Sequence, residues 1–173
     1  DAVAAIVENT GHRAYRGLEG KKNSFDGAAI LSFHVPAWCI SDNLPWSWPF
    51  SLHAFNACGF EFNLNSTTRR VIVVNIHPAL IPRDHLSKQV EWAALTVVGL
   101  ERTFPGSAVI VMGDLNAEPD SSLLSSLITI ANLTHVLNPS GLPNFEYPTT
   151  RPASSNSLDH IFVRGFSEIV SVG

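Results

Sequence analysis

Residues 109–120 read VIVMGDLNAEPD, and this stretch decides the fold of the chain. The apolar run 109–112 predicts a buried β-strand, which Gly113 interrupts just before Asp114 and Asn116. Because residues two apart in an extended chain point to the same side, the strand should deliver a carboxylate and a carboxamide together at its end. Strand ends of this kind carry the polar groups of many open α/β sites. The alternative is a strand, a turn and a helix cap, since Asp and Asn are also turn residues.

The composition is that of one globular domain. The chain has 173 residues, of which 45% are hydrophobic, and this suits a single domain with a substantial core. The formal net charge is −4 and no run of Lys or Arg occurs, so the sequence shows no broad basic face for duplex DNA or RNA. No apolar run approaches the roughly 18 residues of a membrane-spanning helix. The sequence therefore predicts a globular domain without a transmembrane segment.

Hydrophobic periodicity outlines further elements on both sides of the 109–112 strand. We expect helices at 1–9, 85–102 and 121–131, strands at 12–18, 28–33, 55–64, 69–75, 158–163 and 168–172, and a long loop at 138–157. Asp84 is expected to cap the second helix. Leu123, Leu124, Leu127 and Ile128 are expected to point inward from the third.

Two further expectations concern the first half of the chain. The strand at 69–75 is strongly apolar and is expected to be buried on both faces, in a hairpin with 55–64 that turns at 65–68. The Pro- and Trp-rich stretch 35–50 is expected to be an irregular loop. Its Trp side chains would pack it onto the body or, alternatively, present an aromatic rim to substrate or lipid.

Cys39 and Cys58 allow one disulfide without requiring it. Because the sequence lacks the pattern of a disulfide-rich scaffold, we expect both cysteines to be free and buried. The triplets at 65–67 and 132–134 match the N-glycosylation pattern, which matters only in a secreted protein.

Polar pairs stand at the ends of three strongly apolar strands. They are Asn75/His77, Asp114/Asn116 and Asp159/His160. One such pair is uninformative, because a lone His at a strand end commonly has a structural role. Three pairs separated by amphipathic helices indicate strands that converge on one polar site. Within the last pair the two side chains should point to opposite faces, which leaves His160 to pack in the core.

Five motifs occur in an order and spacing that resemble one family. They are DGAAILS, VIVVNIHP, VIVMGDLNAEPDS, YPTTRP and SLDHIFV, and they extend over about residues 27–164. They resemble the endonuclease/exonuclease/phosphatase superfamily, which has the DNase I-like fold. The resemblance implies a layered α/β sandwich, in which two mixed, mostly antiparallel sheets pack face to face with flanking helices. We expect one such domain over residues 1–173, incomplete at both ends.

The resemblance also implies hydrolysis of a phosphate ester with Mg²⁺ or Mn²⁺. His77 matches the histidine that contacts the scissile phosphate, and Asp114 matches the aspartate that orients or deprotonates the attacking water. Asn116 matches the partner that positions water and phosphate, and Asp159 matches the aspartate that holds a second catalytic histidine. Asn75 lies in the family's Asn-x-His pattern and is expected to support substrate binding. A cation and an imidazolium would offset the negative charge of the transition state.

Two parts of the family pattern have no match in the sequence. The strand with the metal-binding Glu and the last strand with an Asp-His pair are not found, which leaves Asp114 as a weak metal ligand. We expect either a fragment or a degenerate member of the family. It would be a metal-dependent phosphoesterase, feebly active as residues 1–173, or a non-catalytic relative with a binding or structural role. The substrate would be a small molecule, a lipid or a single-stranded nucleic acid. Unpaired sheet edges are expected at 69–75 or 109–112, to be completed by another chain or by missing segments.

Overall fold

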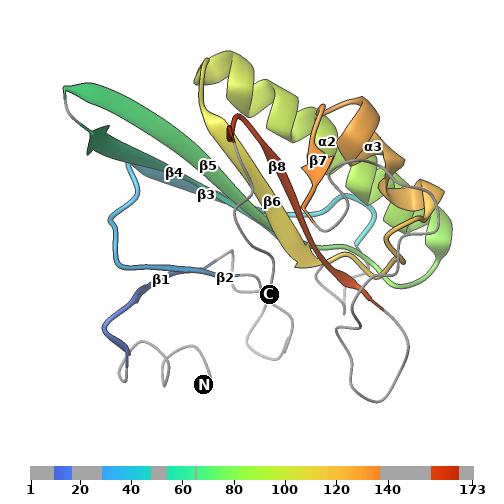
Figure 1. Cartoon of the computed structure of the whole chain (residues 1–173). Coiled ribbons are helices and arrows are strands. Elements are labelled where there is room, and N and C mark those ends of the chain that lie inside the picture. The colour runs from blue at the N-terminus through green and yellow to red at the C-terminus, as the bar shows by residue number, and fades with distance from the viewer. Residues whose placement is uncertain (1–9, 17–28, 48–53, 65, 137–156, 168–173) are drawn as a thin grey trace.

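The computed structural model describes residues 10–16, 29–47, 54–64, 66–136 and 157–167. The described residues form two β-sheets and two α-helices (Figure 1). In chain order the elements are β1 (Arg13–Arg16), β2 (Ala29–Ser32), β3 (Trp38–Asn43), β4 (Ala54–Leu64), β5 (Thr67–His77), α2 (Arg83–Thr103), β6 (Ala108–Asp114), a 3₁₀ turn (Ser122–Leu124), α3 (Ser125–Thr129), β7 (Thr134–His135) and β8 (Asp159–Arg164). None of the described helices is both long and apolar enough to cross a bilayer.

The larger sheet has six strands in the order β3-β4-β5-β6-β8-β7. β5 and β6 run parallel, and the other neighbouring strands pair antiparallel. β4 and β5 form the expected hairpin, although Thr67 already pairs with Leu64 and so belongs to the strand rather than to the turn. The expectation of an unpaired edge at 69–75 or 109–112 is wrong, because β5 and β6 each have a neighbour on both sides.

The helices cover one face of the larger sheet (Figure 1). The apolar stripe of α2 packs there: Leu86, Val90, Ala93, Ala94 and Val97 are buried, and Val98, which the same periodicity places on the stripe, is half-buried against them. The helix begins at Arg83, so Asp84 lies in its first turn and pairs with Lys88 at 3.8 Å instead of capping it. The third expected helix is shorter than 121–131, and Ile128 is 49% exposed rather than inward. Leu124 and Leu127 are buried as expected.

The two-stranded sheet β1-β2 packs on the opposite face of the larger sheet. Ile30 of β2 is buried against Phe60 of β4. Asn56 Nδ2 donates a hydrogen bond to the Tyr15 carbonyl oxygen at 2.6 Å, which ties β4 to β1. The expected α/β arrangement of two sheets with flanking helices is therefore present, with a second sheet of two strands in the described residues.

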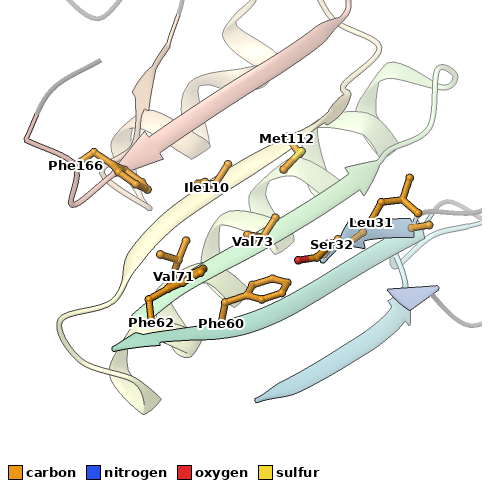
Figure 2. Close-up of a pocket in the computed structure, with 11 residues that line it drawn as sticks. Leu31, Ser32, Phe60, Phe62, Val71, Val73, Ile110, Met112 and Phe166 are labelled. Carbon is orange, nitrogen blue, oxygen red and sulfur yellow. The ribbon is translucent and has the colours of Figure 1, made fainter. Parts of the chain in front are cut away.

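An apolar hollow of about 430 Å³ lies beside β2 on this second face (Figure 2). It is lined by Ala29, Ile30, Leu31, Ser32, Phe60, Phe62, Val71, Val73, Ile110, Met112 and Phe166. The prediction that 69–75 is buried on both faces is wrong for this reason. Val71 and Val73 border the hollow and are half-buried, whereas Ile72 and Val74 are buried under the helices.

The stretch 35–50 was expected to be a loop, but its residues 38–43 form the edge strand β3. Two contacts hold β3 against β4. The Trp38 ring of β3 lies over Gly59 of β4, where a Cβ atom would be 2.3 Å from the ring. The same ring also stacks on Phe104, which follows α2, with centroids 4.8 Å apart. Cys39 and Cys58 form a disulfide across the same strand pair, which corrects the expectation of free thiols.

Other expected strands agree with the structure. The strands at 12–18, 28–33 and 158–163 correspond to β1, β2 and β8. The helix at 1–9, the strand at 168–172 and all but the last residue of the loop at 138–157 lie outside the described residues.

Candidate active site

Three strand ends that carry predicted site residues meet at one end of the larger sheet. β5 ends at His77, β6 ends at Asp114 and β8 begins at Asp159. Asp114 and Asp159 are direct partners in the antiparallel pair of β6 and β8. In the parallel pair, Asn75 is the partner of Met112, and His77 and Asp114 stand two residues further along. The register thus brings the backbones of all three residues together at neighbouring ends of β5, β6 and β8.

Strand alternation places these three residues on the same face of the sheet as the apolar hollow. Ile110 and Met112 of β6 line the hollow, and Asp114 follows them at the same two-residue spacing. Asp114 and His77 are half-buried, and Asp159 is exposed. Polar groups at the end of an apolar face, open in part to solvent, suit the binding of a polar substrate.

Hydrogen bonds hold the segment that begins at the last residue of β6. We call this segment, residues 114–118, the 114–118 loop. The backbone N–H of Asn116 donates to Asp114 Oδ1 at 3.0 Å, which closes a turn stabilised by the aspartate side chain. The N–H of the buried Leu115 donates to the Leu158 carbonyl at 2.7 Å. Asn116 has φ 52°, a left-handed conformation that Asn tolerates better than most residues. Asp114 and Asn116 therefore emerge from a fixed backbone.

The loop between β5 and α2 is joined to the 114–118 loop. Asn116 Nδ2 donates to the Pro78 carbonyl at 2.9 Å, directly after His77. Gln89 of α2 is fully buried and accepts from the Ala79 N–H at 2.6 Å, while its Nε2 donates to the Pro45 carbonyl at 2.8 Å. Sequence reasoning missed Gln89. Its signal is a single long polar side chain on the buried face of an amphipathic helix, where its amide must find partners.

Gly113 allows β5 and β6 to approach closely just before Asp114. Its φ is 143°, and a Cβ atom at this position would lie 2.0 Å from the Ile76 carbonyl oxygen. Asn75 uses its Nδ2 to donate to the Ala29 carbonyl of β2 at 3.1 Å, so its amide connects the two sheets. The role in substrate binding expected of Asn75 stays a prediction.

The far side of the 114–118 loop rests on β8 and the residues before it. Glu118 accepts a hydrogen bond from the Ser157 N–H at 3.3 Å. His160 Nε2 lies 2.8 Å from the Ala117 carbonyl oxygen, and its Nδ1 lies 3.1 Å from His135 Nε2. Burial lowers the pKa of His160, and burial together with the neighbouring His160 lowers the pKa of His135 to about 4. Both rings are buried, as expected for His160.

The donor set at the strand ends fits a divalent cation that binds together with a phosphate. Asp114 and Asp159 place two carboxylates on register-paired residues. The described residues contain no cluster of three or more His, Cys, Asp or Glu side chains that would form a complete metal site. Mg²⁺ commonly binds through one or two carboxylates, several waters and the phosphates of a substrate, rather than through an all-protein cage. Asp114 suits the binding of Mg²⁺ through a carboxylate, waters and the phosphate of a substrate.

The apolar hollow differs in chemistry from the strand ends. Its lining side chains are apolar apart from Ser32, and they include no charged group (Figure 2). A phosphate needs donors or positive charge, so the candidate active site is the group of strand ends and the 114–118 loop.

A mixed β-sheet that carries helices on one face and a second sheet on the other is the arrangement of the DNase I-like fold. The chain belongs to the Endonuclease/Exonuclease/phosphatase family, whose model matches residues 3–173. Among curated protein sequences, none matches the chain.

Several solved structures share the fold. The mannosyl-6-phosphatase of Bacteroides thetaiotaomicron VPI-5482 has a TM-score of 0.69 and 12% identity, with 92% of this chain and 66% of that chain covered. The human Nocturnin catalytic domain with bound sulfate has a TM-score of 0.64 and 15% identity, with 94% and 64% covered. Truncated Caenorhabditis elegans TDP2 has a TM-score of 0.67 and 16% identity, with 95% and 65% covered. The chain thus spans 64 to 66% of the length of these three structures.

Proposed function

We propose that this protein hydrolyses a phosphate ester by direct attack of water. Asp114 orients the water and accepts its proton, and His77 binds the phosphoryl oxygens. The amide oxygen of Asn116 accepts a hydrogen bond from the same water, and Asp159 supplies a second carboxylate that orients a proton donor. The observation that carries this proposal is the convergence of His77, Asp114 and Asp159 at one end of the sheet, beside a loop fixed by hydrogen bonds. Membership of the family supports the same reaction class.

The residues have distinct tasks in this reaction. In-line displacement at phosphorus places negative charge on the phosphoryl oxygens, so positive charge and hydrogen-bond donors there lower the barrier. A carboxylate that holds the water in line converts a bimolecular encounter into an oriented attack. The hydrogen bond from Asn116 Nδ2 to Pro78 keeps this loop at a fixed distance from the end of β5. That link lets the water and the phosphate be positioned together.

We further propose that Mg²⁺ or Mn²⁺ assists, with Asp114 as its ligand from the described residues. When bound, the cation would offset charge on the phosphate. Since the described residues offer no complete metal cluster, we expect the metal to bind tightly only in the presence of the phosphate ester.

The substrate class is a small molecule, a lipid or a single-stranded nucleic acid. The net charge of −4 disfavours the duplex polyanion. The name of one structural neighbour, a mannosyl-6-phosphatase, supports the inclusion of sugar phosphates among the small molecules.

The test is hydrolysis of bis(4-nitrophenyl) phosphate and 4-nitrophenyl phosphate with Mg²⁺ or Mn²⁺. Asp114→Asn should lower kcat by at least about 100-fold, as expected for a positioned acid–base group. Asp120→Asn is the matched control, because Asp120 is exposed six residues further along and has no role in the site. It should turn over like the wild type. Retained activity in a folded Asp114→Asn variant would refute the proposal.

A second candidate function is a non-catalytic relative that binds a phosphate ester. The lack of a complete metal cluster in the described residues favours it. Inorganic phosphate would then bind with loss of affinity in His77→Ala, while neither chromogenic ester is hydrolysed with any divalent cation.

A further inference from the structure

A pair of buried histidines lies beneath the 114–118 loop. His160 follows Asp159 in β8 and points to the opposite face of the strand, where it is 2% exposed. His135 of the neighbouring strand β7 is 6% exposed. The ring atoms His135 Nε2 and His160 Nδ1 are 3.1 Å apart, and His160 Nε2 is 2.8 Å from the Ala117 carbonyl oxygen. Two imidazole rings therefore join β7 to the loop.

The hydrogen bonds fix which nitrogen of each ring carries a proton. A carbonyl oxygen only accepts, so His160 Nε2 is the donor to Ala117. In a neutral ring the other nitrogen then accepts, so His135 Nε2 donates to His160 Nδ1. A proton added to His160 would force His135 into its other tautomer and bury a charge, and burial lowers the pKa of both rings. The geometry fits two neutral rings, each protonated at Nε2.

The hydrogen bond from His160 to Ala117 lies next to Asn116, whose backbone conformation needs support from its surroundings. Ala117 directly follows Asn116, whose φ of 52° is a conformation that surrounding contacts must hold in place. On the other side of Asn116, the Leu115 N–H donates to Leu158. The His160 bond therefore completes the support of Asn116 from both sides along the chain.

We propose that His160, oriented by His135, is a positioning residue for the hydrolysis, because it holds the 114–118 loop in the conformation that presents Asp114 and Asn116. This inference rests on the proposed function of those two residues. A role in packing alone does not account for the arrangement. An apolar ring would fill the same space without the cost of burying polar nitrogens, and both ring nitrogens of His160 have hydrogen-bond partners, which fixes the orientation of that ring.

Two conservative substitutions separate the two hydrogen bonds of His160. His160→Gln places an amide donor near the position of Nε2 and can keep the bond to Ala117. His160→Asn places an acceptor near the position of Nδ1, so it can keep the bond to His135 but does not reach Ala117. We expect His160→Asn to lower kcat about 10- to 100-fold, the usual effect of removing a residue that orients a site group, with little change in KM. His160→Gln should recover most of that loss.

A core control separates positioning from loss of stability. Leu127 of α3 is fully buried in the core under the helices, and its apolar side chain makes no hydrogen bond to the 114–118 loop. Leu127→Ala should lower the melting temperature without lowering kcat per folded molecule. If His160→Asn and His160→Gln lose kcat equally, or if Leu127→Ala matches His160→Asn in kcat, His160 is a packing residue and the inference is wrong.

Ring-nitrogen NMR on the wild-type protein tests the same inference without any turnover. We expect His160 to show a protonated Nε2 and an unprotonated Nδ1, and the backbone amides of the 114–118 loop to exchange faster in His160→Asn than in His160→Gln. A charged His160, a proton on its Nδ1, or equal amide exchange would overturn the inference. If the wild type hydrolyses no phosphate ester, the proposed function fails and these spectra alone decide whether His160 holds the loop. If His160→Asn does not fold, the wild-type ring signals decide.

Discussion

The close approach of β5 and β6 at Gly113 gives the sharpest mutational prediction. A Cβ atom at Gly113 would lie 2.0 Å from the Ile76 carbonyl oxygen and 3.0 Å from Asn75 Oδ1, and φ is 143°. A backbone conformation reserved for glycine costs any other residue about 1–3 kcal/mol. Overpacking against a backbone atom that cannot move aside adds about 1–3 kcal/mol. We therefore expect Gly113→Ala to lower the free energy of unfolding by about 2–6 kcal/mol.

Gly99 supplies the matched control for this substitution. It lies on the exposed face of α2, and nothing is within 4 Å of a Cβ atom built there. Because alanine favours the helix over glycine, Gly99→Ala should raise the free energy of unfolding by up to about 1 kcal/mol. The two glycine-to-alanine changes should thus have opposite signs.

Urea unfolding and thermal melting measure both variants. For a chain of this size, the loss expected for Gly113→Ala corresponds to a fall in melting temperature of about 5–20 °C. To make room for the added Cβ atom, β6 would have to shift relative to β5. This shift should move Asp114 away from His77 and lower kcat/KM. If Gly113→Ala is as stable as the wild type, the two strands do not approach as described, and the shared location of His77 and Asp114 loses its structural basis.

Three further predictions test other contacts. Gln89→Leu leaves the buried Ala79 N–H without its acceptor, so urea unfolding should show a loss of about 1–3 kcal/mol, and unchanged stability would contradict the role given to Gln89. The pKa of folded His135 is about 4, below its ordinary 6.5, so the folded state binds fewer protons than the unfolded state. Stability should therefore fall as the pH drops from about 6.5 to 4, with a shallower fall in His135→Phe, and equal pH profiles for both proteins would count against this. Replacing Cys39 and Cys58 together by Ser removes a cross-link between residues 19 apart and should cost about 2–4 kcal/mol, an effect that a reducing agent reproduces in the wild type alone.

The sequence predicted β6 well because its signal is local. Four apolar residues followed by Gly113 and Asp114 determine a buried strand, its end and the exit of a carboxylate without knowledge of any partner. The family motifs also identified the ends of β5 and β8, which the register then brought level with Asp114.

The edge strand β3 could not be predicted in the same way. Its neighbouring prolines and Trp residues indicate a loop, and its pairing depends on features of β4 that are distant in sequence. These are the space above Gly59 that receives Trp38 and the bond from Cys39 to Cys58. Local patterns do not contain such tertiary contacts.

The hydrogen bonds of the buried polar residues could not be predicted from the sequence for a related reason. Periodicity places Gln89 and His160 on buried faces but does not identify the backbone groups that they bond. Those partners, Ala79 and Ala117, belong to loops whose course is set by the whole fold. The supports of the site therefore appeared only with the structure, whereas its charged members were visible from the motifs.

The central claim is that His77 and Asp114 act on one phosphate, and a double-mutant cycle in kcat/KM tests it most directly. The wild type, His77→Ala, Asp114→Asn and the double variant are compared on bis(4-nitrophenyl) phosphate at one concentration of Mg²⁺. Groups that act as a unit in one transition state show strongly non-additive losses. We predict that the double variant is hardly slower than the slower single variant. Losses that multiply, or a wild type that turns over no faster than Asp114→Asn, would contradict the claim.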